Sequence, residues 1–211
     1  MKTEIVFILD RSGSMAGLES DTIGGYNSML ARQREEPGEA VVTTVLFDDK
    51  YELLHDRADI RAIRPITERE YYVRGCTALL DAIGKTINKI DSAQKNILPE
   101  FRADKVLFII TTDGLENASR EYSYASVSSL IERAKKEYGW EFLFLGANID
   151  AAAEGGRLGI SPEHTVRYRP DRRGTLLNYE AVNEAVTCVR RGAPIKAGWK
   201  KKIEEHFRQG E

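Results

Sequence analysis

The stretch Ile5-Val6-Phe7-Ile8-Leu9-Asp10-Arg11-Ser12-Gly13-Ser14 decides the fold class of this sequence. Five consecutive apolar residues, rich in β-branched and aromatic side chains, predict a strand that is covered on both faces. The strand runs directly into a polar loop with one carboxylate, two hydroxyls and a glycine. Because ligands of open α/β sheets bind at the carboxyl ends of the strands, this stretch predicts a buried sheet with a ligand site at its edge.

Three further apolar runs predict strands of the same kind, at Val41–Phe47, Val106–Ile110 and Phe142–Leu145. The segments between them show helical spacing, as in Leu79, Leu80, Ile83, Ile87 and Ile90. A short strand at Tyr51 to His55 is expected to pair antiparallel at one edge. This alternation of strands and helices predicts an α/β fold with a central, mostly parallel sheet and helices on both faces.

The rest of the chain continues the same pattern. We expect a first helix whose buried face carries Ile23, Tyr26, Met29 and Leu30, and later helices with stripes at Val127, Leu130, Ile131, Ala134 and Tyr138 and at Leu176, Tyr179, Val182, Val186 and Val189. A strand is expected at 165–168 and a last short helix at about 196–208. On a prior of about 150 residues per domain, we interpret residues 1–211 as a single domain.

Composition and charge exclude several classes of partner. The 31 Lys plus Arg and 33 Asp plus Glu nearly cancel, and the net charge of −2 gives no field that favours nucleic acid or an anionic membrane. The first apolar run is too short for a secretory signal, and no later run reaches the length of a membrane span. We therefore expect a cytoplasmic protein, in which Cys76 and Cys188 are reduced, packed thiols.

Acidic and hydroxyl side chains recur where two of the strands end. Asp10, Ser12 and Ser14 alternate along an extended loop and can converge on one point, and the strand at 106–110 leads into Asp113-Gly114. Two buried carboxylates at neighbouring strand ends repel each other unless a cation neutralises them. Oxygen ligands suit a hard cation such as Mg²⁺, which keeps several waters and needs few protein ligands.

These residues resemble a known metal site. Asp10-x-Ser12-x-Ser14, Thr77 within Arg74-Gly75-Cys76-Thr77-Ala78, and Asp113-Gly114 are similar to the metal-ion-dependent adhesion site of von Willebrand factor A-type (VWA) domains. The resemblance covers nearly the whole chain and implies the Rossmann-like VWA fold. It also implies that the three hydroxyls bind Mg²⁺, or Mn²⁺, and that both aspartates hold the ion directly or through water.

By the same resemblance, the sixth coordination position is left for an Asp or Glu carboxylate of a protein partner. Stand-alone intracellular members of the family, in bacteria and their phages, are similar to this chain. We therefore expect an interaction module that is not an enzyme, engaging neither nucleic acid nor membrane. Two alternatives stay open, namely a Mg²⁺-dependent phosphohydrolase and a structural module whose metal site is permanently filled.

Each candidate ligand also has a simpler interpretation. Asp10 or Asp113 alone could be a helix cap, Ser12 and Ser14 turn residues, and Thr77 the N-cap of the following helix. Asp48 and Asp49 end another strand, so either could tune the site as a hydrogen-bond acceptor. In VWA relatives the last helix shifts with metal coordination, and the segment of this chain that corresponds to it is Leu176–Arg191.

Two other sequence features do not indicate a functional site. Gly84-Lys85-Thr86 resembles part of a phosphate-binding loop, but the required earlier glycine is Leu79 and the triplet is expected inside a helix. His55, His164 and His206 lack metal-ligand spacing and are expected to be surface or packing residues.

Overall fold

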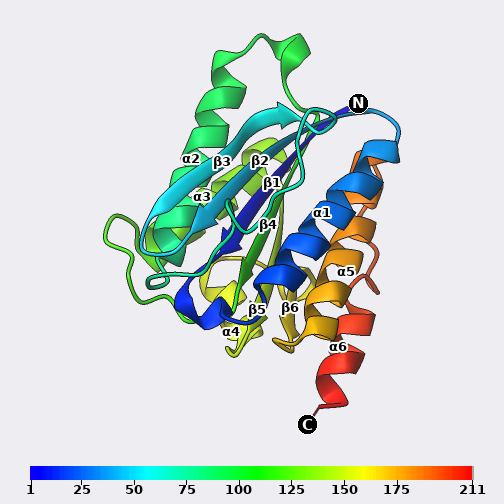
Figure 1. Ribbon diagram of the computed structural model, residues 1–211. Helices are drawn as coiled ribbons and strands as arrows, with labels where there is room; N and C mark the ends of the chain where they lie inside the picture. The colour runs from blue at the N-terminus through cyan, green and yellow to red at the C-terminus, as the bar shows by residue number, and fades with distance from the viewer. Residues whose placement is uncertain (211) are drawn as a thin grey trace.

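The computed structural model describes residues 1–210 and shows a six-stranded sheet in the order β3-β2-β1-β4-β5-β6 (Figure 1). The strands are β1 (Lys2–Asp10), β2 (Glu39–Phe47), β3 (Tyr51–Asp59), β4 (Lys105–Thr112), β5 (Glu141–Ala147) and β6 (Thr165–Tyr168). Neighbouring strands pair in parallel, except that β3 pairs antiparallel with β2 at one edge. The predicted fold class is confirmed.

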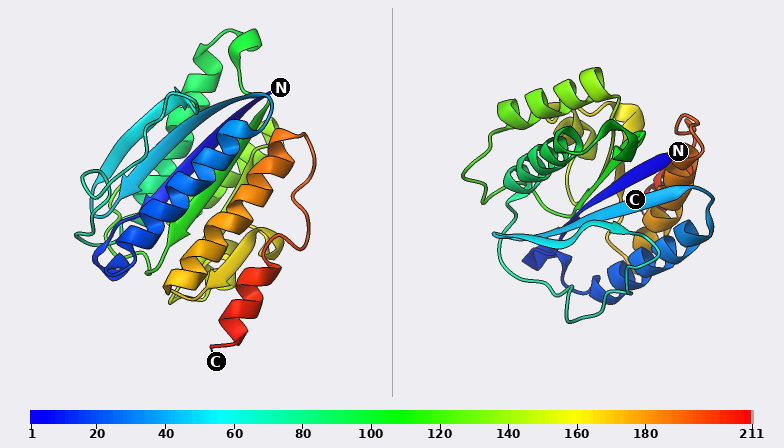
Figure 2. Two further views of the ribbon diagram at one scale, coloured as in Figure 1. Left: turned by 45° about the vertical axis from the view of Figure 1, so that its right-hand side comes forward. Right: turned by 90° about the horizontal axis from the view of Figure 1, so that it is seen from above.

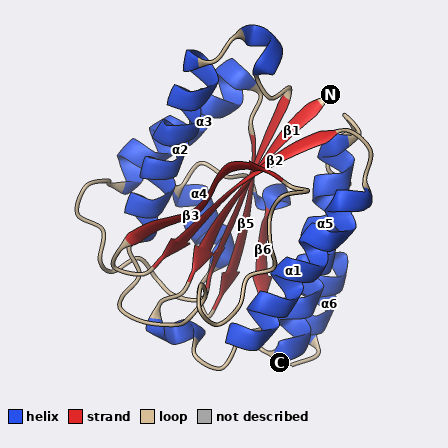
Figure 3. Ribbon diagram, turned by 45° about the horizontal axis from the view of Figure 1, so that its top comes forward, coloured by secondary structure: helices blue, strands red, loops and turns tan. Residues whose placement is uncertain are grey.

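Helices cover both faces of the sheet, as Figures 2 and 3 show. On one face lie α1 (Glu19–Glu35) and α5 (Arg172–Arg190), and on the other lie α2 (Leu79–Asn96) and α3 (Tyr124–Tyr138). Two shorter helices complete the set, α4 (Ala151–Arg157) and α6 (Lys201–Arg208), together with one-turn 3₁₀ helices at Gly13–Met15, Pro99–Phe101 and Pro162–His164. Within residues 1–210, no helix combines the length and the apolarity needed to cross a membrane.

Strand β1 explains why the apolar runs are continuous. Ile5, Phe7 and Leu9 pack into the core below α1 and α5, whereas Val6 and Ile8 pack into the core below α2 and α3. Successive side chains of a strand point to opposite faces, so a strand with helices on both sides is apolar at most positions. Each such side chain contributes about 1.5–3 kcal/mol when it is fully buried.

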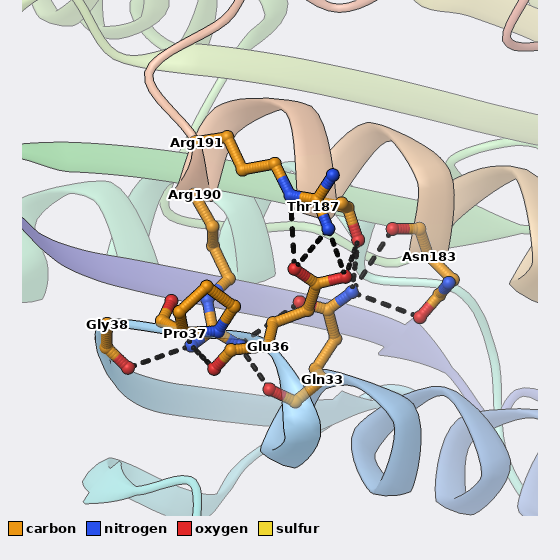
Figure 4. Close-up of polar contacts among 8 residues, drawn as sticks. All are labelled: Gln33, Glu36, Pro37, Gly38, Asn183, Thr187, Arg190 and Arg191. Atoms are coloured by element: carbon orange, nitrogen blue, oxygen red, sulfur yellow. Dashed lines mark hydrogen bonds and ion pairs between the residues drawn. The ribbon is translucent and has the colours of Figure 1, made fainter.

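A buried arginine joins the end of α1 to the end of α5 (Figure 4). Arg190 donates hydrogen bonds to the backbone carbonyl of Gln33 and, at 3.1 and 3.0 Å, to those of Glu36 and Gly38. The last carbonyls of a helix lack partners within the helix, and the Arg190 guanidinium supplies donors to them. Its neighbour Arg191 instead forms an exposed ion pair with Glu36 at 2.8 Å.

Several local expectations were wrong. Leu176 is 50% exposed, because the buried face of α5 begins one residue away, and Leu177 packs against the core instead. The edge strand is longer than predicted and extends to Asp59. The last helix is shorter and begins at Lys201. Cys76 is an exposed thiol rather than a packed one, and both cysteines are free.

Candidate metal centre

The loop after β1 holds the first part of the site. Asp10, at the end of β1, is 1% exposed, and its Oδ1 accepts a hydrogen bond from the Ser12 backbone N–H at 2.7 Å. Its Oδ2 accepts one from the Thr112 hydroxyl at 2.6 Å, and Thr112 is the last residue of β4, the neighbouring strand. The Tyr71 hydroxyl donates to the backbone carbonyl of Asp10 at 2.6 Å. These bonds fix the carboxylate at the carboxyl edge of the sheet.

The other predicted residues meet this loop through a chain of hydroxyl groups. Thr77 Oγ1 donates to Ser12 Oγ at 3.0 Å, and Ser12 Oγ lies 3.1 Å from Ser14 Oγ. Ser14 Oγ in turn donates to Asp113 Oδ1. The five residues come from three loops, which follow β1, precede α2 and follow β4. The structure therefore brings all five predicted residues together.

For Thr77, Asp113 and Ser12 the simpler interpretations do not match the geometry. The N-cap of α2 is Ala78, and the Thr77 hydroxyl bonds Ser12 instead of capping the helix. Asp113 starts no helix either, because α3 begins at Tyr124 after an N-cap at Ser123. Ser12 precedes a one-turn 3₁₀ helix but makes no side-chain cap to it. The three hydroxyl oxygens and Asp113 Oδ1 bond one another across the loops, whereas Asp10 Oδ1 accepts a hydrogen bond from the Ser12 N–H of its own loop.

Backbone contacts hold the three loops in register. The Gly13 N–H donates to the Gly75 carbonyl at 3.1 Å, which joins the first loop to the second. Asn117 Oδ1 accepts from the Thr77 N–H at 2.9 Å, and the Asn117 N–H donates to the Thr77 carbonyl at 3.0 Å, which joins the second loop to the third. At Gly114, a Cβ would lie 3.3 Å from Ser14 Oγ, so a residue without a side chain suits this close approach.

The electrostatics of the site favour a bound cation. Asp113 is 2% exposed, and its Oδ2 has no hydrogen-bond partner. Burial, followed by the nearby charge of Asp10, raises the pKa of Asp113 to about 6. Burial also raises the pKa of Asp10. A buried, unpartnered carboxylate oxygen costs about 1–3 kcal/mol or more, and a cation between the two carboxylates would remove that cost.

The donor set fits a hard divalent ion. Three hydroxyl oxygens and two carboxylates are the oxygen ligands that Mg²⁺ and Mn²⁺ accept, and such a set leaves coordination positions for water or another carboxylate. Both oxygens of Asp10 already accept hydrogen bonds, so this residue is suited to hold the ion through water. Within residues 1–210 no group of three or more His, Cys, Asp or Glu side chains is placed to hold a metal.

Asp48, which was expected to tune the site as a hydrogen-bond acceptor, bonds two arginines of the site loops and none of the five candidate ligands. Its carboxylate is fully buried and accepts hydrogen bonds from Arg11 Nε at 2.8 Å and from Arg74 Nε at 2.7 Å. Burial alone would raise the pKa of Asp48, but the bonds from Arg74 and Arg11 lower it below the ordinary value. Arg11 belongs to the first loop and Arg74 to the second, so the Asp48 carboxylate joins the two loops. Asp49 lies against Gly75, where a Cβ would meet its Oδ1.

Comparisons with solved structures identify the fold. The chain superposes on a von Willebrand factor type A protein from Catenulispora acidiphila with a TM-score of 0.57 and 15% identity, covering 86% of this chain and 42% of that one. Manganese-loaded TRAP protein of Plasmodium vivax superposes with a TM-score of 0.60 and 18% identity, covering 83% of this chain and 72% of that one. Proximal thread matrix protein 1 of the mussel byssus superposes with a TM-score of 0.59 and 18% identity, covering 88% of this chain and 46% of that one.

These similarities establish that the chain has the VWA-type fold, as its sequence motifs suggested. The chain spans less than half the length of the mussel and Catenulispora proteins. No protein-family model matches the sequence, and no curated protein matches it. At identities of 15–18% the neighbours define the fold alone.

Proposed function

We propose that the protein is a metal-dependent interaction module that holds Mg²⁺ or Mn²⁺ at Asp10, Ser12, Ser14, Thr77 and Asp113. One observation carries the proposal, namely the three hydroxyls from separate loops that meet two buried aspartates, one of which has an unpartnered oxygen. TRAP, a neighbour with the same fold, is manganese-loaded in its solved structure, which supports a divalent ion here. The bound ion would polarise the groups that complete its coordination shell.

The partner in this proposal supplies a carboxylate. Two aspartates around a divalent ion leave no excess negative charge to repel an anion, and the hydroxyl ligands are neutral. Ser14 and the loop residue Gly13 are exposed, so the site can be reached from solvent on this side. An Asp or Glu side chain from a protein is the anionic group that fits an oxygen-preferring ion at such a position.

The proposal includes no catalysis. The side chains at the site are hydroxyls and two aspartates, and the three histidines make their contacts elsewhere. His206 lies 3.0 Å from an oxygen of Asp171, and His55 lies 3.3 Å from the Tyr26 hydroxyl. The phosphohydrolase alternative needs a general base beside the ion, and these histidines do not provide one. We also propose an intracellular location, where the two free cysteines stay reduced.

The test uses a carboxylate probe, a short peptide with one central glutamate, in saturating Mg²⁺. NMR titration of the isotope-labelled protein should show binding that a chelator abolishes and that Thr77→Ala abolishes. Thr187→Ala is the matched control, since this half-buried hydroxyl lies in the α1–α5 interface and bonds Gln33. Probe binding that persists in the chelator or in Thr77→Ala would refute the proposal.

A further inference from the structure

A groove of about 980 Å³ opens beside the candidate metal centre. Its walls come from the turn between β2 and β3, from Gly75 and Cys76, from the first turns of α2, and from the loop at 117–121. Gly75 and Cys76 immediately precede Thr77, and Asn117 bonds its backbone. A partner segment that reaches the metal can therefore extend into this groove.

Half of the six charged residues in the groove already have partners within the protein. Lys85 forms a 2.6 Å ion pair with Glu121. The Asp81 carboxylate accepts hydrogen bonds from the backbone N–H groups of Arg120, Glu121 and Tyr122 at 2.9–3.0 Å. These contacts shape the loop at 117–121 and give Asp81 and Lys85 partners within the protein.

Two cationic side chains in the groove have no partner of this kind among the residues that the structure describes. Lys50 and Arg120 are exposed, and within residues 1–210 neither side chain forms an ion pair or a hydrogen bond. They come from different segments, the β2–β3 turn and the loop at 117–121. Asp49, the remaining acidic residue of the groove, lies against Gly75. The unpaired charge is therefore two cations against one carboxylate.

The groove is better suited to a carboxylate than to a phosphate. Phosphate sites use free backbone N–H groups, but those of Ala118, Ser119, Arg120 and Glu121 already donate to carboxylates of Glu116 and Asp81. What remains for an anion is the side chains of one lysine and one arginine. Such side chains bind carboxylates of peptides, with the arginine fork matching the two oxygens.

We propose that the groove binds the partner segment that flanks the metal-binding carboxylate, and that Lys50 and Arg120 bind a second carboxylate on this segment. This inference rests on the proposed function of the metal centre. It narrows the partner to an acidic peptide segment with two carboxylates a few residues apart.

The experiment compares three glycine peptides in saturating Mg²⁺ by NMR titration: one with a single central glutamate, and two with a second glutamate three residues before or after it. At least one doubly acidic peptide should bind about tenfold more tightly than the singly acidic one, because a further charge pair contributes on this scale. The double variant Lys50→Ala/Arg120→Ala should lose this advantage while its affinity for Mg²⁺ and for the singly acidic peptide stays unchanged.

The matched control is Arg64→Ala/Lys136→Ala, which removes one exposed arginine and one exposed lysine outside the groove. This control should keep the tenfold advantage. Equal binding of all three peptides by the wild type, or an advantage that survives in Lys50→Ala/Arg120→Ala, would overturn the inference and leave the metal-centre proposal standing. If the singly acidic peptide still binds when the chelator is present, the proposed function itself is overturned.

Discussion

Replacing Asp48 with asparagine removes the charge that ties two of the three site loops together. Asp48 and Arg11 have fully buried side chains, and Arg74 donates to the same Asp48 oxygen. The variant keeps the size of the side chain but leaves the Arg11 guanidinium with a single charged partner, the half-exposed Glu52 at 2.7 Å. Arg11 Nη1 already lacks a hydrogen-bond partner, so this arginine depends strongly on Asp48.

The expected loss of stability follows from the burial of the pair. Breaking a buried ion pair by removing one partner costs about 3–5 kcal/mol. Because Glu52 remains beside Arg11 and asparagine keeps one acceptor oxygen, we expect the lower end, about 3 kcal/mol. For a protein of this size, this loss lowers Tm by about 6–12 °C.

Asp56→Asn is the matched control, because Asp56 pairs with Lys89 at 2.8 Å on the surface, with 53% and 28% of the side chains exposed. This exposed pair contributes less than about 1 kcal/mol. Urea denaturation at pH 7 should therefore separate the two variants by about 2 kcal/mol. Equal losses in Asp48→Asn and Asp56→Asn would refute the view that Asp48 holds the loops.

Two further predictions concern other buried polar groups. Arg190→Met should lower the free energy of unfolding by about 2–4 kcal/mol, because the carbonyls after α1 lose their charged donor. Arg191→Met removes only an exposed ion pair and should lower it by less than about 1 kcal/mol. Similar urea midpoints for the two variants would contradict this prediction. Asp81→Asn should cost about 1–3 kcal/mol at pH 7. Burial raises the pKa of Asp81, but three backbone N–H donors lower it below the reference value of 3.8. The ionised Asp81 therefore stabilises the fold above about pH 3.8, and this effect is lost as pH falls through the folded-state pKa of Asp81. The free energies of unfolding of the wild type and the variant should converge in acid. A difference between them that stays constant down to about pH 2 would exclude this role.

The sequence was informative where burial is complete. The apolar runs predicted β1, β2, β4 and β5, because strands covered on both faces are apolar at most positions. The sequence predicted the edges of the buried helix faces less accurately. Leu176 fits the stripe of α5 by spacing, yet it is half exposed, since a 3.6-residue period defines a face only to within about one residue.

The site was predictable by residue type and position, but its supporting contacts were not. The alternation of Asp10, Ser12 and Ser14 and the glycine after Asp113 are local signals. The role of Asp48 depends on Arg11 and Arg74, which are distant in sequence and meet only in the folded sheet. Asn117 lies 40 residues from Thr77, and no local signal in the sequence predicts its bond to the Thr77 backbone.

The most direct test of the account is isothermal titration of the metal-free protein with Mg²⁺ and with Mn²⁺, performed on the wild type, Asp10→Ala, Thr77→Ala and the surface control Asp56→Ala. One binding event is expected in the wild type and in the control, and its loss is expected in both site variants. Metal binding of equal affinity in all four proteins, or no binding by the wild type even with the glutamate peptide present, would contradict a metal centre at these residues.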